Sequence, residues 1–221
     1  MNRAYFNGLK VVANQDGRVY ALFFDGTGND NIQRPLQTNL RDRQFRLVCT
    51  FPSVTGSDQQ IFDLGERAAT TDRFSATYYS TVNGTADFVV GIDIPLSTST
   101  AWSIQNSGFS VGNVNTVICD VDSNLAISEA SINGVLLTNP ANAGSRYQGG
   151  SINSYRLGTR PNGDFPYKGV IIEWRDGDDV FNDENNWGDF TITGAKRCYT
   201  DNFDDAVPTW RLDSDDSIIT L

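Results

Sequence analysis

The sequence predicts an all-β protein whose strands form an antiparallel sandwich or jelly roll. Turn-forming residues are abundant, because Asp outnumbers Glu 23 to 4 and Asn and Gly contribute 20 residues each. Glu, Lys and Met favour helices, whereas Asn, Asp and Gly favour turns. Short apolar patterns recur at spacings of roughly 10 to 15 residues, which is typical of sandwiches and jelly rolls and not of alternating strands and helices.

The first half of the chain contains five strand patterns. The first is a continuous apolar run, and the second alternates apolar and polar residues before it stops at Pro52. The last two flank Asn83-Gly84, a pair that is typical of a hairpin turn. In chain order the five patterns are Val19–Phe24, Phe45–Phe51, Gln60–Leu64, Phe74–Tyr79 and Ala86–Val90.

The second half continues in the same way, and no stretch has a convincing helical period. Asn133-Gly134 between two apolar stretches predicts a second hairpin. The strand patterns here are Val114–Val121, Leu125–Ile132, Val135–Leu137, Tyr155–Gly158, Val170–Trp174, Thr191–Thr193, Thr209–Leu212 and Ser217–Leu221.

Charge and composition exclude several functions. The formal net charge is −10 and the pI is about 4.4, so the chain repels phosphate backbones and anionic lipid. We therefore expect neither nucleic acid nor membrane among its partners. The absence of histidine excludes Ser-His-Asp and Cys-His nucleophile systems, histidine bases and the commonest zinc ligand.

The three cysteines, Cys49, Cys119 and Cys198, form no zinc-binding spacing and no disulfide framework. An odd number of separated cysteines predicts buried free thiols in a chain made in a reducing cytoplasm. Residues 1–20 contain no apolar signal core, and no run of apolar residues is long enough to span a membrane. We expect synthesis in the cytoplasm without a signal peptide.

The order of these patterns resembles the laminin G-like domains of the concanavalin A-like family. The resemblance extends over about residues 19 to 178. One departure is Val114-Asn115-Thr116, where the family usually has Trp-His before a strand. The segments that carry the resemblance are Ala21–Asp30, Phe45–Phe51, Gln60–Gly65, Val114–Asp122, Ser131–Leu136, Tyr155–Gly158 and Tyr167–Ile172.

The resemblance implies a concanavalin A-like jelly-roll β-sandwich of two antiparallel sheets. It divides the chain into an N-terminal extension (1–18), the sandwich (19–178), and an acidic loop with C-terminal strands (179–221). We expect this last segment to be ordered and packed on the sandwich or on a partner, because a frayed tail would rarely end in three aliphatic residues out of four. Tyr5-Phe6 and Val11-Val12 are its expected strand partners.

The fold family includes glucanases, so catalytic carboxylates were sought. Retaining glucanases need two carboxyl groups about 5–5.5 Å apart, yet no two of the four glutamates here are two or four residues apart. Strict alternation places Glu173 on the face of Ile171 and Arg175. Ile172 and Trp174 would then share the opposite face. We expect Glu173 to pair with Arg175 or solvent, and we expect no enzymatic activity.

The loop from Asp176 to Asp189 is rich in the oxygen ligands that calcium prefers. Its D-x-D start resembles an EF-hand, but Val180, Phe181 and Trp187 occupy ligand and glycine positions, so that pattern fails. The alternatives are a calcium loop of another geometry and a solvated acidic loop. The candidate calcium ligands are Asp176, Asp178, Asp179 and Asn182.

Trp187 lies among Asp and Asn residues in this loop, and a sugar site needs an aromatic ring beside such polar groups. The alternative is that Trp187 packs the loop against the sandwich. Trp102 has the same two interpretations, whereas Trp174 and Trp210 lie in strand patterns and are expected in the core. The candidate carbohydrate-binding residues are Trp187, Asn185, Asn186, Asp183 and Trp102.

The chain lacks a signal core, histidine and a disulfide framework, and its turns are rich in Asn and Asp. In these respects it resembles a bacteriophage virion protein more than a secreted laminin G module. We therefore expect a non-enzymatic capsid decoration, head-fibre or tail component with a lectin-like domain, made in the host cytoplasm and located on the virion. Its expected partners are other virion subunits, further copies of itself and host-surface glycans. The alternatives are a bacterial carbohydrate-binding module and a β-glucanase-like hydrolase.

Overall fold

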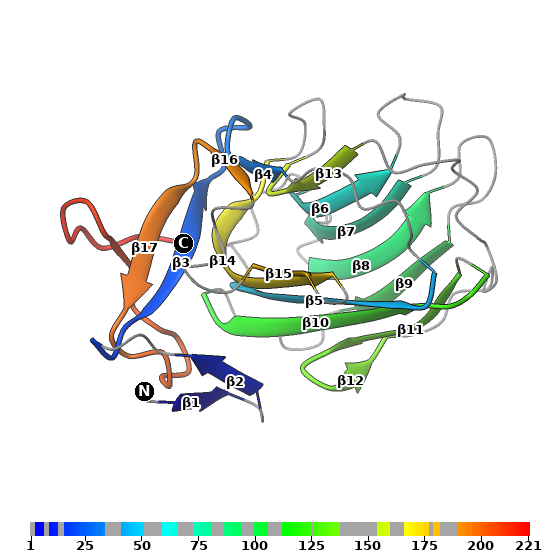
Figure 1. Cartoon of the computed structure of the whole chain (residues 1–221), viewed down its shortest axis with the longest axis horizontal. Helices are drawn as coiled ribbons and strands as arrows, with labels where there is room; N and C mark the ends of the chain where they lie inside the picture. The colour runs from blue at the N-terminus through cyan, green and yellow to red at the C-terminus, as the bar shows by residue number, and fades with distance from the viewer. Residues whose placement is uncertain are drawn as a thin grey trace.

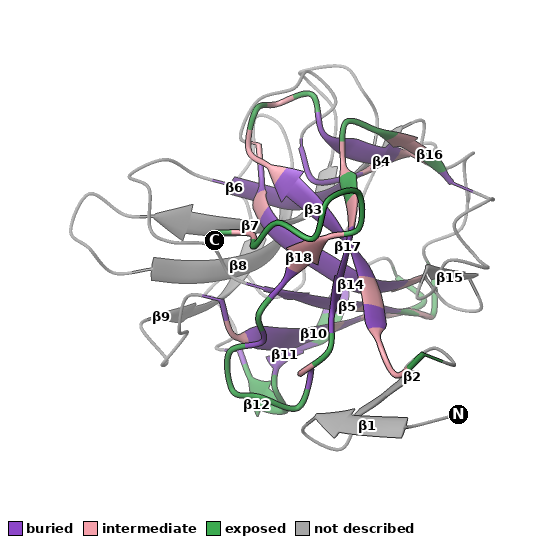
Figure 2. Ribbon diagram, turned by 90° about the vertical axis from the view of Figure 1, so that its left-hand side faces the viewer, coloured by how far each residue is buried: buried purple, intermediate pink, exposed green. Residues whose placement is uncertain are grey.

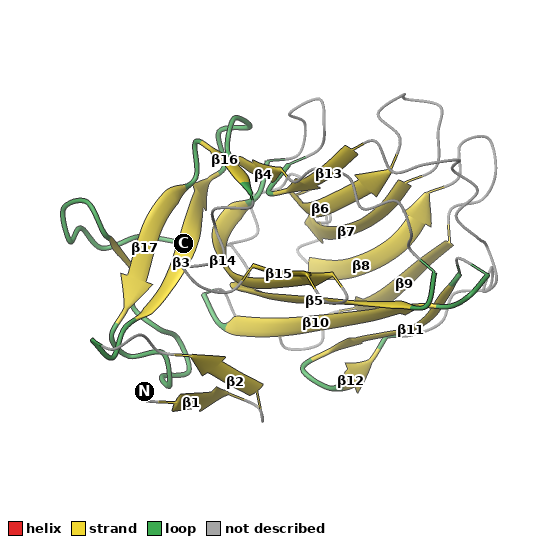
Figure 3. Ribbon diagram, in the orientation of Figure 1, coloured by secondary structure: helices red, strands yellow, loops and turns green. Residues whose placement is uncertain are grey.

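The structure of the chain is a computed structural model, and it consists of antiparallel strands (Figure 3). No helix occurs in the residues that the structure describes. The prediction of an all-β protein is therefore confirmed. The described residues are 3–6, 9–12, 16–33, 41–50, 59–65, 73–80, 86–93, 100–105, 112–124, 126–137, 154–159, 166–176, 179–181 and 190–221.

Two large sheets pack face to face as a sandwich (Figure 1). The nine-stranded sheet has the order β12 (Val135–Leu136), β11 (Ile127–Ile132), β10 (Val114–Val121), β5 (Arg43–Thr50), β14 (Lys168–Asp176), β3 (Val19–Asp25), β17 (Lys196–Thr200) and β18 (Arg211–Leu212), with β15 (Asp179–Phe181) paired to β14. The seven-stranded sheet has the order β16 (Thr191–Thr193), β4 (Asn31–Gln33), β13 (Ser154–Leu157), β6 (Gln59–Gly65), β7 (Arg73–Ser80), β8 (Ala86–Asp93) and β9 (Thr100–Gln105).

A separate two-stranded sheet joins β1 (Arg3–Phe6) to β2 (Leu9–Val12). The expectation that these residues pair with the C-terminal segment is wrong. Phe6 pairs with Leu9 across a two-residue connection, and such a local hairpin forms at a lower cost in chain entropy than pairing with the distant end of the chain.

Both predicted hairpins are present. Ser80 pairs with Ala86 between β7 and β8, and Ile132 pairs with Val135 between β11 and β12. In the second hairpin Asn133 and Gly134 have φ angles of 50° and 79°. Positive φ at both central residues defines a type I′ turn, the geometry for which an Asn-Gly pair is best suited.

Strand β3 is apolar on both faces because both of its faces are covered. Leu22 and Phe24 belong to the core between the two sheets. Val19, Ala21 and Phe23 belong to a second apolar cluster on the opposite face of the nine-stranded sheet. A continuous apolar run is the pattern expected of a strand that is buried on both sides.

The core between the sheets is centred on Trp174 of β14, which is fully buried as predicted. Its ring centroid lies 4.9 Å from that of Phe62 in β6 and 5.8 Å from that of Phe45 in β5. Tilted aromatic pairs at these distances stabilise a core beyond their buried area. Cys49 and Cys119 are buried here as free thiols, as predicted.

The second apolar cluster lies on the outer face of the nine-stranded sheet, under the C-terminal segment (residues 201–221). Phe203 and Trp210 of this segment are buried against Val48, Val170 and Cys198. Figure 2 shows the buried strands β3, β14 and β5 at this end of the molecule. The end of the chain contributes further partly buried side chains: Leu212, Ile219 and Leu221.

Two connections cross between the sheets side by side. The chain leaves β3 in the nine-stranded sheet and enters β4 in the seven-stranded sheet, and later it leaves β16 and enters β17 in the reverse direction. Because β3 pairs with β17 and β4 pairs with β16, the two connections are neighbours at one corner of the sandwich.

Candidate functional site

Most of the residues predicted to bind calcium or sugar lie outside the described residues: Asp178, Asn182, Asp183, Asn185, Asn186 and Trp187. Asp176 and Asp179 are described as backbone only, and they face each other where β14 turns into β15. Trp102 of β9 lies opposite Val90 of β8, and the side chain of Trp102 is also outside the described part. Within the described residues, no three His, Cys, Asp or Glu side chains are placed to hold a metal ion.

Glu173 is buried, and it pairs with two arginines. Its Oε1 lies 3.3 Å from Nε of Arg46 and 3.4 Å from Nε of Arg175. Arg175 is the partner that the sequence predicted, whereas Arg46 comes from the neighbouring strand β5 and had no local signal. A buried carboxylate between two guanidinium groups holds β5 and β14 together, and removing any member would leave a buried charge without its partner.

The alternation predicted for this strand is wrong. Ile171 and Trp174 belong to the same core, whereas Ile172 belongs to the outer cluster. The register between β14 and β5 shifts between Ile171 and Glu173, so Ile172 is the extra residue of a β-bulge. A bulge reverses the alternation of the residues that follow it.

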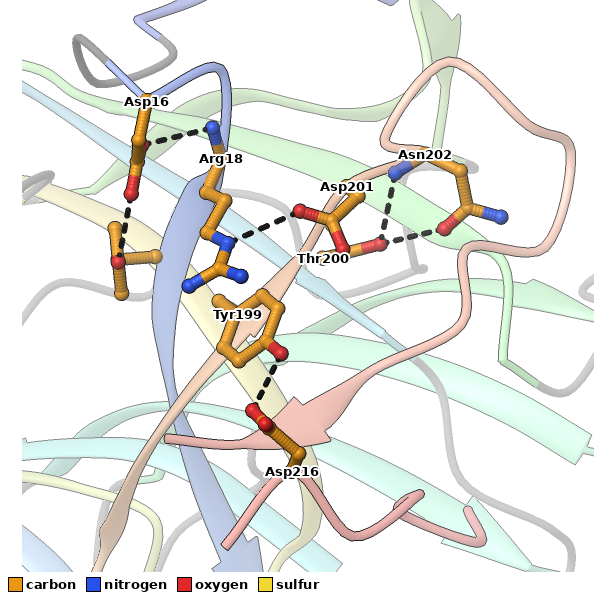
Figure 4. Close-up of polar contacts among 8 residues, drawn as sticks. Asp16, Arg18, Tyr199, Thr200, Asp201, Asn202 and Asp216 are labelled. Atoms are coloured by element: carbon orange, nitrogen blue, oxygen red, sulfur yellow. Dashed lines mark hydrogen bonds and ion pairs between the residues drawn. The ribbon is translucent and has the colours of Figure 1, made fainter. Parts of the chain in front are cut away.

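A group of arginines and tyrosines joins β3 to β17 on the face that also carries Leu22. Figure 4 shows part of this group, with Arg18 beside Tyr199 and with Asp201 and Asp216 as their partners. The guanidinium carbon of Arg18 lies 4.1 Å from the ring centroid of Tyr199, and that of Arg197 lies 4.3 Å from the ring centroid of Tyr20. The two rings are 6.0 Å apart. Each arginine thus stacks on a tyrosine of the other strand, which is a favourable cation–π arrangement.

Aspartates of the C-terminal segment complete this group. Arg18 Nε donates to Asp201 at 3.1 Å, Arg197 Nε lies 3.4 Å from Asp213, and Tyr199 Oη donates to Asp216 at 2.6 Å. The hydrogen bond to Asp216 raises the pKa of Tyr199 above its ordinary value. We call these residues, with Tyr20, the arginine–tyrosine clamp, because they hold the C-terminal segment on β3 and β17.

The clamp has a signal in the sequence, which is a short triplet that occurs twice. Arg18-Val19-Tyr20 and Arg197-Cys198-Tyr199 are two R-x-Y triplets. In a strand, residues two apart share a face, so each triplet places an arginine beside a tyrosine. The triplets are nearly 180 residues apart, and only the pairing of β3 with β17 brings them together.

A polar row crosses the outer face of the seven-stranded sheet. Thr191 lies opposite Gln33, Gln33 opposite Arg156, and Arg156 opposite Asp63. The alternate residues Leu157 and Phe62 point into the core, so this row faces away from it. The side chains of Thr191, Gln33 and Arg156 reach the surface, whereas Asp63 is only 1% exposed. Hydroxyl, amide and guanidinium groups in a row can exchange several hydrogen bonds with the hydroxyls of a sugar.

No family model matches this chain, and no curated protein matches it. Solved structures do match. The chain aligns with a heptameric pentraxin of Limulus polyphemus at 16% identity and a TM-score of 0.52, over 74% of this chain and 77% of the pentraxin. It aligns with domains LG4-5 of the mouse laminin alpha1 chain at 17% identity and a TM-score of 0.57, over 81% of this chain and 46% of that chain.

A third match is the full-length tailspike protein 2 of a bacteriophage of Escherichia coli O157:H7, at 14% identity and a TM-score of 0.56. It covers 85% of this chain but only 25% of the tailspike. This chain therefore spans about half of the laminin chain and a quarter of the tailspike chain that it matches. The fold is the concanavalin A-like jelly-roll β-sandwich. In the described residues, no helix has the length and apolar character of a membrane span.

Proposed function

We propose that this chain is a non-enzymatic structural protein of a bacteriophage particle, whose jelly-roll domain binds glycans of the host surface. The accessible part of the polar row, Thr191, Gln33 and Arg156, carries the glycan-binding part of the proposal. It presents planar hydrogen-bonding groups on the face of the sandwich that is turned away from the core. The phage part is supported by the family resemblance and by the likeness to one module of a tailspike.

The chemistry around Glu173 supports a binding protein more than a hydrolase. This carboxylate is shared by Arg46 and Arg175 within a sheet, and a glycosidase requires a second carboxylate placed across the sugar. We therefore expect purified protein to release no reducing sugar from β-glucans. Turnover that persists through purification and disappears in Glu173→Gln would contradict this part of the proposal.

Glycan binding is tested with the purified chain on an array of bacterial surface glycans. Arg156→Gln is expected to weaken binding by about tenfold, because a charged hydrogen bond to the ligand is lost. Trp187→Ala tests the sugar-binding residue predicted from the sequence in the same experiment. Arg211→Gln removes an arginine from the far end of the other sheet and serves as the control. Equal affinity of Arg156→Gln and Arg211→Gln for the glycan would exclude the polar row as the glycan-binding site.

The proposal includes calcium as a ligand of the loop that starts at Asp176. Binding to the folded state alone would raise the melting temperature as calcium is added and lower it again on chelation. Magnesium at the same concentration is the control. A melting temperature that responds to neither ion would remove calcium from the proposal.

A bacterial carbohydrate-binding module would give the same glycan binding but would not be part of a particle. We expect the chain to sediment with phage particles and to be visible on them by electron microscopy, in contact with other virion subunits or with copies of itself. A chain found only as part of a secreted enzyme would favour the carbohydrate-binding module.

A further inference from the structure

Two aspartates lie in contact at the corner where the chain crosses from β3 to β4. Asp30 is 5% exposed, and its Oδ2 accepts a hydrogen bond of 2.7 Å from the backbone N–H of Asp25. The charge of Asp25 also acts on the Asp30 carboxyl group, so the two acids are electrostatic neighbours. Asp25 Oδ1 accepts from the N–H of Thr27 at 3.0 Å, which fixes the direction of its carboxyl group.

The neighbouring connection, where β16 leads into β17, packs against this pair, and we call it the C-terminal corner. Gly194 has a φ of +73°, and a Cβ at this position would overlap Oδ1 of Asp30. Two residues later, Lys196 Nζ lies 3.6 Å from Oδ2 of Asp25. The pair therefore contacts the C-terminal corner at two points, one by close packing and one by charge.

Ionising both of two neighbouring carboxyl groups is unfavourable, and burial adds to that cost. Burial raises the pKa of Asp30, and the charge of Asp25 raises it further. Burial acts in the same direction on Asp25, but hydrogen bonds with Thr27 and the charge of Lys196 hold the pKa of Asp25 below its ordinary value. Asp30 is thus the group that keeps the proton.

The other charged groups at this corner are few. Lys168 of β14 lies opposite Asp25 in the register, and Lys196 belongs to β17. The segments next to Asp30 contribute Gly194 and the backbone around Gly158, neither of which titrates. Among the described residues, Lys196 is the cation that an ion pair joins to this pair of aspartates.

We propose that Asp25 and Asp30 form a proton-dependent latch between the two corners, which is closed while Asp30 carries a proton and loosens when the proton leaves. Without the proton, two adjacent carboxylates repel each other directly beneath Gly194. The C-terminal corner would then lose its packing surface, although Lys196 still attracts Asp25. The latch thus couples the attachment of β16 and β17 to pH.

The sign of the effect follows from which state binds the proton more tightly. The pKa of Asp30 is higher in the folded chain than in the unfolded chain, so its contribution to stability is complete below the unfolded value of about 4. That contribution is lost as pH rises through the folded pKa. The ionised Asp25 contributes in the opposite direction and loses its contribution as pH falls through its own lowered pKa.

The test is a pH titration of the intact chain from about pH 3 to pH 8, followed by the ¹³C shift of the Asp30 carboxyl group and by amide exchange. We expect Asp30 to titrate above the ordinary aspartate value. Exchange at Ala195 and Lys196, corrected for its intrinsic pH dependence, should accelerate over the same range, while exchange at Val117 in the centre of β10 should not. An ordinary titration of Asp30, or equal acceleration at Val117, would overturn the latch.

Variants separate the latch from general stability. In Asp30→Asn the amide can donate to Asp25 and accept from its N–H at every pH, so the pH-dependent acceleration should disappear. Asp204→Asn, which removes an exposed aspartate of the C-terminal segment outside the clamp, should leave it unchanged. If Asp30→Asn does not fold, Lys196→Met decides. Loss of this half-exposed cation should move the transition to higher pH, and an unmoved transition would overturn the proposal.

Discussion

Gly169, at the start of β14, shows how close a neighbour can lie when no side chain intervenes. A Cβ at this position would overlap the hydroxyl and ring of Tyr167. That hydroxyl is buried, donates to the carbonyl oxygen of Thr50 at 2.5 Å and lies 3.2 Å from the carbonyl oxygen of Val170. Tyr167 therefore joins β5 to β14 through a space that only glycine leaves open.

We expect Gly169→Ala to lower the free energy of unfolding by about 3 kcal/mol, because the methyl group must displace a buried, hydrogen-bonded side chain. Urea unfolding measures the change. Gly17→Ala is the control, since Gly17 has a φ of +84° but no atom within 4 Å of the added Cβ. Its cost should be only the backbone cost of about 1–2 kcal/mol. A larger loss in Gly17→Ala than in Gly169→Ala would contradict this account of the packing.

At the scale of elements, the C-terminal segment is held both by apolar packing and by polar and charged contacts. Its apolar side chains cover the outer face of the nine-stranded sheet, and its aspartates take part in the arginine–tyrosine clamp. Trp210 is 1% exposed in the apolar contact, whereas Ile218 of the same segment is 61% exposed. These two residues allow the contribution of burial to be measured within one element.

Trp210→Ala is expected to lower the free energy of unfolding by about 3–5 kcal/mol, since it leaves a large cavity between this segment and the sheet. Ile218→Ala removes an aliphatic side chain that contacts mainly solvent and should change stability by no more than about 0.5 kcal/mol. Thermal unfolding of both variants provides the comparison. Similar melting temperatures for Trp210→Ala and Ile218→Ala would show that the segment does not stabilise the sandwich.

The sequence was sufficient to predict most of the strands of the sandwich, because period-two alternation and Asn-Gly pairs are local signals. It did not predict β4, β9, β15 or β17, which our strand patterns do not include. It was not sufficient for the bulge at Ile172, since Ile171-Ile172-Glu173 reads equally well as regular alternation. Arg46 could not be assigned to Glu173 for a different reason. The two residues meet only because β5 and β14 are neighbours, and strand order is set by the whole fold. Of the candidate site, most of the predicted loop lies outside the described residues, and the polar row also depends on strand order.

At the scale of the whole molecule, the reactivity of the three thiols measures the opening of both apolar clusters. Cys49 and Cys119 lie between the sheets, and Cys198 lies under the C-terminal segment. Burial raises the pKa of each thiol well above its ordinary value, so none should react as a thiolate in the folded chain at neutral pH.

We expect all three cysteines to react with a thiol reagent at one common rate, set by global unfolding, because the strands β3, β5 and β14 contribute to both clusters. Mass spectrometry of labelled peptides during a time course in mild denaturant identifies which thiol has reacted. Iodoacetamide labelling of the fully unfolded chain is the reference for intrinsic reactivity. Faster labelling of Cys198 than of Cys49 would show instead that the C-terminal segment opens by itself.

The position of β3 between β14 and β17 has a consequence for how the chain is made. Both neighbours of this early strand are encoded late, since Asp25 pairs with Lys168 and Val19 pairs with Thr200. At about 5–20 residues per second, a ribosome needs roughly 7–30 s to produce the first of these partners. During that interval the apolar run of β3 has neither of its sheet neighbours. A nascent chain that stalls before β14 would therefore expose an unpaired, aggregation-prone apolar strand. Successful folding in the cell depends on keeping that strand from pairing with other chains until synthesis is nearly finished.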